Sequence, residues 1–216
     1  MGQTITRYFK KEEIDDNVIF KIANELKKGK LVVFPTDTVY GIGTNAYDKD
    51  ACTRIYEVKK RPKVKPLSVL ISDFSMLTQM VASISPTEKK LMEAFWPGPL
   101  TILFKKKEGV LPNVVSTNEF IAIRLISECL IYKLIQASGV PIVAPSANLS
   151  GSPTGIKIEN ITKELDGKVD YILDCGDIQN DMVSTIIQVQ EEKAYIIREG
   201  KIRKEEVAKI VPVKMK

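Results

Sequence analysis

The chain of 216 residues has no histidine, one tryptophan and three cysteines. The absence of histidine excludes Ser-His and Cys-His catalytic pairs and any imidazole zinc site. Cys52, Cys129 and Cys175 are widely spaced and odd in number, which favours free thiols over a disulfide framework. No apolar run approaches the ~18 residues of a transmembrane helix, and residues 1–13 lack the apolar region of a secretory signal. We therefore expect a cytoplasmic protein with no membrane partner.

The composition is that of a globular chain with a substantial core. Hydrophobic residues make up 44% and charged residues 27% of the sequence, which excludes disordered, collagen-like and coiled-coil proteins. The length fits one domain, which we place at residues 1–216 with its core at about 15–210. The net charge of +5 is compatible with polyanionic ligands.

Short apolar runs alternate with helical stripes along the chain. Strands are predicted at residues 31–34, 67–71, 100–104, 121–125, 141–144, 171–174, 184–189 and 194–198, the last two as a hairpin. Helices are predicted at residues 18–26, 50–60, after Asp73, from a capping box at 85–88 to Pro97, at 130–138 and at 203–210, with Asp50 as the cap of the second. This interleaving predicts an α/β fold with a mixed parallel and antiparallel sheet of about seven strands, flanked by helices.

A polar segment, PTDTVYG at residues 35–41, directly follows the first predicted strand. Two threonines, a carboxylate and a tyrosine at a strand end are more than a turn needs, so we predict a ligand-binding loop; a polar turn is the alternative. The next residues, 41–46, match the Gly-x-Gly-x-x-Ala pattern of dinucleotide sites. That match is weak, because no helix is predicted to begin at the glycines.

The most basic stretch holds Lys59, Lys60, Arg61, Lys63 and Lys65. The prolines at positions 62 and 66 stiffen its backbone, which lowers the entropy cost of holding cations against phosphates. A solvated surface is the alternative. The chain has no Walker A sequence, so side chains of this kind would have to neutralise any bound triphosphate.

Three further features point to a site. Ser146 and Asn148 are two residues apart in an extended segment, so they can face one ribose, phosphate or base; an Asx turn is the alternative. Arg124 lies in the otherwise apolar strand 121–125, and a buried arginine requires an anionic partner. Ser184 and Arg198 stand at opposite ends of the predicted hairpin and should therefore lie close together.

In their order along the chain, these motifs resemble the YrdC-like domain of threonylcarbamoyl-AMP synthases. The matching segments are PTDTVYG, Lys59-x-Arg61 with KPLSVLI, WPGPLTI, IAIR, Ser146-x-Asn148, STI and IIREG, across about residues 15–210. The resemblance implies a twisted mixed sheet with a concave, basic cavity. It also implies a nucleotidyltransferase that forms L-threonylcarbamoyladenylate and pyrophosphate from L-threonine, bicarbonate and ATP, for the threonylcarbamoylation of adenosine 37 in tRNA.

The resemblance further implies the roles of individual residues. Lys59 and Arg61 would be the catalytic residues, and together with Lys65 they would hold the triphosphate. The other ATP contacts would come from Ser146, Asn148, Thr154 and Arg198, and the threonine contacts from Thr38, Arg124, Ser184 and the backbone of Ala144. Mg²⁺ would arrive with ATP, without a protein-bound metal site. Threonylcarbamoyl-transferase proteins would act downstream, and contact with tRNA or other RNA would be weak.

The chain departs from the family pattern at residues 126–129, where many relatives have proline or histidine, and at Ile187-Gln188, where aspartate is frequent. We expect a short form without the extra C-terminal domain of some relatives. Two other functions stay open: an RNA-binding paralogue without synthase activity, and a carbamoyl-adenylate activity that uses carbamoyl phosphate. The presence of both the Lys-x-Arg and the Ser-x-Asn pairs favours the synthase.

Overall fold

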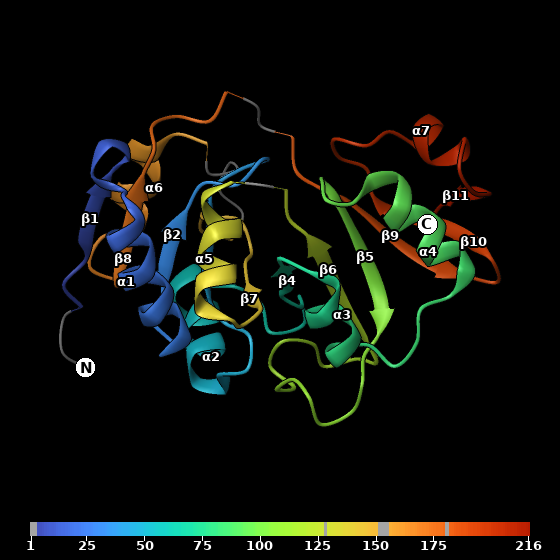
Figure 1. The fold of residues 1–216 in the computed structure, drawn as a ribbon, viewed down its shortest axis with the longest axis horizontal. Coiled ribbons are helices and arrows are strands. Elements are labelled where there is room, and N and C mark those ends of the chain that lie inside the picture. The colour runs from blue at the N-terminus through green and yellow to red at the C-terminus, as the bar shows by residue number, and fades with distance from the viewer. Residues whose placement is uncertain (1–3, 128, 151–155, 180–181) are drawn as a thin grey trace.

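The computed structural model describes residues 4–127, 129–150, 156–179 and 182–216. Its strands are β1 (Arg7–Lys10), β2 (Val32–Phe34), β3 (Gly41–Asn45), β4 (Ser68–Ile71), β5 (Leu100–Lys105), β6 (Phe120–Leu125), β7 (Ile142–Val143), β8 (Tyr171–Asp174), β9 (Thr185–Gln190), β10 (Lys193–Arg198) and β11 (Val213–Met215). Its α-helices are α1 (Asp16–Lys27), α2 (Lys49–Lys59), α3 (Phe74–Met80), α4 (Pro86–Phe95), α5 (Leu130–Ser138), α6 (Ile158–Leu165) and α7 (Lys204–Ala208). Figure 1 shows how these elements are arranged.

All of these strands belong to one sheet, in the order β1-β8-β2-β3-β7-β4-β6-β5-β9-β10-β11. The sheet contains parallel pairs such as β4 with β6 and antiparallel pairs such as β6 with β5, which confirms the predicted mixed sheet. The sheet is wider than the predicted seven strands, and it extends beyond residues 15–210 at both ends through β1 and β11. Helices cover it: α1 packs against α5, while α3 contacts β4 (Figure 1).

Several helix ends follow from local chemistry. The predicted capping box is confirmed, since Ser85 Oγ accepts from the Glu88 amide at 3.2 Å and the Glu88 carboxylate accepts from the Ser85 amide at 2.6 Å. The predicted cap of α2 is wrong. Asp48, not Asp50, accepts a hydrogen bond from the Ala51 amide at 2.9 Å, so Asp50 lies inside the first helical turn. No helix in the described ranges is long and apolar enough to cross a membrane.

The Gly-x-Gly-x-x-Ala match is a strand and not a phosphate loop. Residues 41–45 form β3, which pairs with β2 on one side and β7 on the other. A Cβ on Gly43 would lie 2.7 Å from Ile142 Cγ2 and 2.7 Å from the Val143 carbonyl oxygen. Glycine is therefore required here because β7 approaches the β3 backbone closely.

Candidate active site

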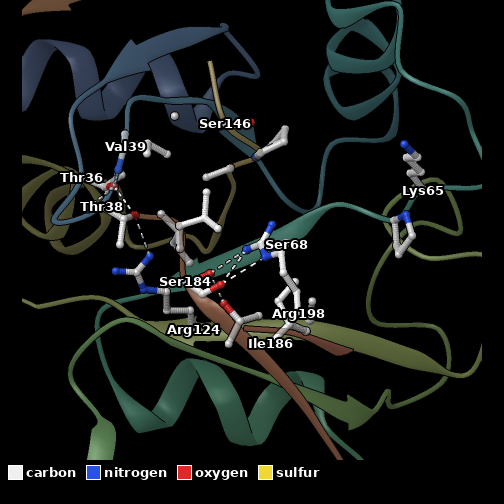
Figure 2. Close-up of a pocket in the computed structure, with 18 of the residues that line it drawn as sticks. Thr36, Thr38, Val39, Lys65, Ser68, Arg124, Ser146, Ser184, Ile186 and Arg198 are labelled. Atoms are coloured by element: carbon white, nitrogen blue, oxygen red, sulfur yellow. Dashed lines mark hydrogen bonds between the residues drawn. The ribbon is translucent and has the colours of Figure 1, made fainter. Parts of the chain in front are cut away.

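A cavity of about 560 Å³ lies against one face of the central strands (Figure 2). Successive residues of a strand point to opposite faces, and this cavity is lined by alternate residues of β4, β6 and β5 and by one residue of β9. The lining residues on these strands are Ser68 and Leu70, Ala122 and Arg124, Thr101 and Leu103, and Ile186. The intervening residues, such as Val69, Ile123 and Ile102, are buried on the other side of the sheet. The cavity floor therefore consists of small and aliphatic side chains around one arginine.

The walls come from the segments that the sequence singled out. Residues 36, 38–41, 61, 64–66, 144–146, 183–184 and 197–198 all line the cavity. The structure thus brings together eight of the predicted site residues, namely Thr38, Arg61, Lys65, Arg124, Ala144, Ser146, Ser184 and Arg198. Lys59 and Asn148 are not among the lining residues, and Thr154 lies outside the described residues.

Arg124, in the cavity floor, is held by three partners. Its side chain is almost completely buried; Nε donates to the Gly98 carbonyl at 2.8 Å and Nη1 to Thr38 Oγ1 at 3.2 Å. Nη2 forms an ion pair with Asp37. Burial lowers the pKa of Arg124, and the neighbouring Asp37 carboxylate opposes that shift. The anion that a buried arginine requires is therefore supplied, at least in part, by the PTDTVYG loop.

Thr36 shapes this loop. Its hydroxyl accepts from the backbone amides of Thr38 and Val39 at 3.1 and 3.2 Å and donates to the Val39 carbonyl at 2.6 Å. It also lies 3.0 Å from the Thr38 hydroxyl. These bonds close a tight turn, which places the Thr38 hydroxyl between Thr36 and Arg124, as Figure 2 shows.

Arg198 and Ser184 are neighbours, which confirms the prediction from the hairpin. Arg198 Nη2 donates to the Ser184 carbonyl at 2.8 Å and to its hydroxyl at 3.2 Å. The Ser184 hydroxyl also lies 2.9 Å from that of Thr101. Burial lowers the pKa of Arg198, and repulsion from Arg124 and Arg61 lowers it further. Three guanidinium groups therefore lie close enough to repel one another, and an anionic ligand would offset this repulsion.

Arg61 folds back on its own loop. Its Nε donates to the Lys65 carbonyl at 3.0 Å and its Nη2 to the Pro66 carbonyl at 2.8 Å. Burial lowers the pKa of Arg61. These two bonds and the two prolines fix the basic loop at one rim of the cavity, where the exposed Lys65 also stands (Figure 2).

Lys59, which is not among the lining residues, links the Lys-x-Arg and Ser-x-Asn motifs. Its ammonium group donates to the backbone carbonyls of Ser146 and Asn148, and its side chain is fully buried. The Ser146 hydroxyl in turn donates to the Asn148 side-chain oxygen. The two motifs are therefore one connected unit.

Some functional features were missed in the sequence. The Asp37–Arg124 pair joins residues too far apart in the chain for any local pattern to reveal it. Tyr40 donates to the Gly176 carbonyl at 2.8 Å and accepts from the Cys175 amide at 3.0 Å, so it anchors the connection that leads to Ser184. Within the described parts of the chain, no three His, Cys, Asp or Glu side chains are grouped closely enough to hold a metal ion.

Known proteins resemble this chain in fold and in sequence. The family model Sua5_yciO_yrdC, described as "Telomere recombination", matches residues 24–200. The "Threonylcarbamoyl-AMP synthase" of Bacillus subtilis is 39% identical over 91% of this chain, and the chain spans 57% of that relative. A relative in Methanocaldococcus jannaschii is 37% identical over 96% of this chain, and 98% of its own length is covered.

Solved structures agree with the sequence matches. A structure described as "Crystal structure of P. abyssi Sua5 complexed with L-threonine" superposes with a TM-score of 0.89 at 35% identity, over 98% of this chain and 63% of that one. The chain therefore spans less than two thirds of the Bacillus and Pyrococcus proteins. Motifs in family order around one cavity, and a family match over residues 24–200, show that the chain belongs to the Sua5–YciO–YrdC family.

Proposed function

We propose that the chain is an L-threonylcarbamoyladenylate synthase, which makes threonylcarbamoyl-AMP and pyrophosphate from L-threonine, bicarbonate and ATP. The observation that carries this proposal is the convergence of Arg61, Arg124 and Arg198 with the Thr38 and Ser184 hydroxyls on one cavity. Such a site suits a substrate pair with a carboxylate, a hydroxyl and a triphosphate. The cavity volume of about 560 Å³ falls within the ~300–1,000 Å³ of small-molecule sites.

The reaction needs positioning more than covalent help. The threonine amine attacks the carbon of bicarbonate and water leaves, which gives a carbamate. An oxygen of that carbamate then attacks the α-phosphorus of ATP, and the bond to the β,γ-pyrophosphate breaks. Holding the reactants together and neutralising the phosphate charge supply most of the rate in such transfers. A site without histidine can therefore perform it.

The proposed assignment follows the cavity wall. Arg61, Lys65 and Arg198 would neutralise the triphosphate, because these three cations line the cavity. Ser146, Asn148 and Thr154 would hold the nucleoside. Arg124 would receive the threonine carboxylate, while Thr38, Ser184 and the backbone of Ala144 would surround the rest of threonine. Direct contact of Lys59 with phosphate stays a prediction, and its geometry supports a different role.

The remaining expectations belong to the same proposal. Magnesium would enter as part of the substrate Mg·ATP, so no residue is assigned to it. The product would be used by a threonylcarbamoyl-transferase acting on tRNA in the cytoplasm. A mixed anhydride of carbamic and phosphoric acids is labile, so its consumer must act promptly. Any direct contact with tRNA would be through phosphate charge and would weaken steeply with salt.

Pyrophosphate release tests the proposal. With Mg·ATP and bicarbonate, the protein should release pyrophosphate when L-threonine is added and much more slowly with L-valine, which lacks the hydroxyl group. Release that is independent of the amino acid, or no release from protein that binds ATP, would reject the synthase. Salt-sensitive RNA binding without pyrophosphate release would favour the RNA-binding paralogue. Release with carbamoyl phosphate alone would favour the carbamoyl-adenylate activity.

A further inference from the structure

We propose that Lys59 is a positioning residue that holds segment 146–148 in the conformation that receives the nucleoside. Lys59 would thus act on nucleotide binding through Ser146 and Asn148, not through its own contact with phosphate. This inference rests on the proposed function, because it takes the cavity as a nucleotide site.

The contacts of Lys59 point to the segment. Its ammonium donates to the carbonyl oxygens of Ser146 and Asn148, and its own carbonyl accepts from the Ser150 amide at 2.9 Å. Lys59 is the last residue of α2, so a rigid element supplies all three bonds. The end of one helix therefore fixes the path of residues 146–150.

Burial separates Lys59 from the other cations of the motif. Its side chain is 1% exposed, and it is absent from a lining that includes its neighbour Arg61 and its partner Ser146. A buried ammonium costs several kcal/mol unless hydrogen bonds compensate it, and the two carbonyls provide that compensation. To reach a phosphate in the cavity, Lys59 would have to give up both of these charge-assisted hydrogen bonds.

Two further hydrogen bonds hold segment 146–148 alongside those of Lys59. Its middle residue is tied to the PTDTVYG loop, because the Ala147 amide donates to the Tyr40 carbonyl at 2.7 Å. Its end is tied to α6, because the Leu149 amide donates to Glu164 at 2.9 Å. Lys59 binds the carbonyls on both sides of Ala147. This orients the Ser146 and Asn148 side chains, which hydrogen-bond to each other.

The charges around Lys59 are consistent with a held, buried cation. Burial, followed by repulsion from Arg61, lowers the pKa of Lys59 to about 8, and Glu164 raises it. Glu164 comes from α6 and also holds the Leu149 amide, so it supports the segment and the lysine together. The ammonium form, which makes charge-assisted bonds, is therefore the main form at neutral pH.

The discriminating experiment compares the binding of ATP with that of adenosine, which has no phosphate. Lys59→Met keeps the length of the side chain but removes its donors. A positioning role predicts that Lys59→Met lowers the affinity for adenosine and the affinity for ATP by a similar factor, about tenfold or more. Lys65 is an exposed cation of the lining, so Lys65→Met should lower the affinity for ATP and leave the affinity for adenosine unchanged. Lys63→Met, exposed and outside the lining, is the matched control and should change neither affinity.

A loss of ATP affinity alone would overturn the inference. If the Lys59→Met protein bound ATP more weakly but bound adenosine as tightly as the unmodified protein does, Lys59 would be a phosphate contact. Hydrogen exchange of the backbone amides in the ligand-free protein gives a second readout. If Lys59→Met does not fold, Lys59→Gln is used in its place for this measurement. Amides 147–150 should exchange faster in the variant while those of α4 do not; unchanged exchange would also reject the inference. This readout needs no ligand, so it stays decisive even if the protein binds no nucleotide and the proposed function fails.

Discussion

Arg124→Lys separates the two tasks of this side chain. In the structure, Arg124 bonds to the Gly98 carbonyl at 2.8 Å and to Thr38 at 3.2 Å, and it pairs with Asp37. A lysine ammonium can still pair with the Asp37 carboxylate. It cannot reproduce the planar fork that serves several acceptors at once, including a bidentate carboxylate. The variant should therefore fold but bind threonine poorly.

The two expected losses differ in size and in kind. A buried Gly98 carbonyl without its donor costs about 1–3 kcal/mol of unfolding free energy. In a chain of this length each kcal/mol lowers Tm by about 2–4 °C, so Tm should fall by roughly 2–12 °C. Losing the bidentate pairing with threonine should weaken its binding roughly tenfold to a hundredfold, or about 1.4–2.8 kcal/mol. ATP affinity should change much less, because other residues are assigned to ATP.

Calorimetric titration of threonine and of ATP, at a temperature where both proteins are folded, measures these losses separately. Arg54→Lys is the matched control, because Arg54 forms an ion pair with Asp170 at 3.2 Å away from the cavity. It should leave threonine affinity unchanged. If folded Arg124→Lys bound threonine as tightly as the unmodified protein, Arg124 would only hold the Asp37 loop in place. The assignment of the threonine carboxylate to Arg124 would then be wrong.

Three further predictions follow from the same contacts. Arg61→Ala should cost about 2–4 kcal/mol of transition-state stabilisation, measured from kcat/KM, as the loss of other preorganised charge stabilisers does. Lys107 is exposed, and Lys107→Ala should change kcat/KM little. Equal losses in the two variants would mean that the overall charge matters and not a specific site. Because burial and Arg61 lower the pKa of Lys59 to about 8, its protonated form is lost as the pH rises through 8. Binding of ATP should therefore weaken between pH 7.5 and roughly 9 in the unmodified protein but not in Lys59→Met, and two parallel profiles would contradict this. Gly43→Ala should destabilise the fold by about 1–3 kcal/mol in thermal unfolding, because its Cβ would lie 2.7 Å from Ile142 Cγ2; an unchanged Tm would show that β7 can move aside.

Local signals in the sequence predicted much of the fold. The capping box at Ser85, the helix at residues 130–138 and the hairpin of β9 and β10 depend on neighbouring residues, and the structure confirms each of them. Strand β3 was missed because its sequence, GIGTN, is rich in residues that are rare in strands. It is stable because both of its neighbours pair with it. Helix α6 was missed although Ile158, Ile161 and Leu165 follow a helical spacing that was readable.

The site could be predicted in its parts but not in its connections. Motif order identified the segments, and eight of the predicted residues do line one cavity. The ion pair of Arg124 with Asp37 and the bonds of Lys59 to segment 146–148 join residues far apart in the chain. Such pairings depend on the sheet order, in which β7 lies between β3 and β4. No local pattern carries that information.

The most direct test of the central claim follows one carbon atom. The protein is incubated with Mg·ATP, L-threonine and ¹³C-bicarbonate, and the nucleotide products are analysed by mass spectrometry. The proposed reaction predicts a threonylcarbamoyl-AMP ion that is heavier by one mass unit than the product from unlabelled bicarbonate, formed together with pyrophosphate. A threonine-containing adenylate without the label would mean that the carboxylate of threonine itself is activated, and this result would contradict the account.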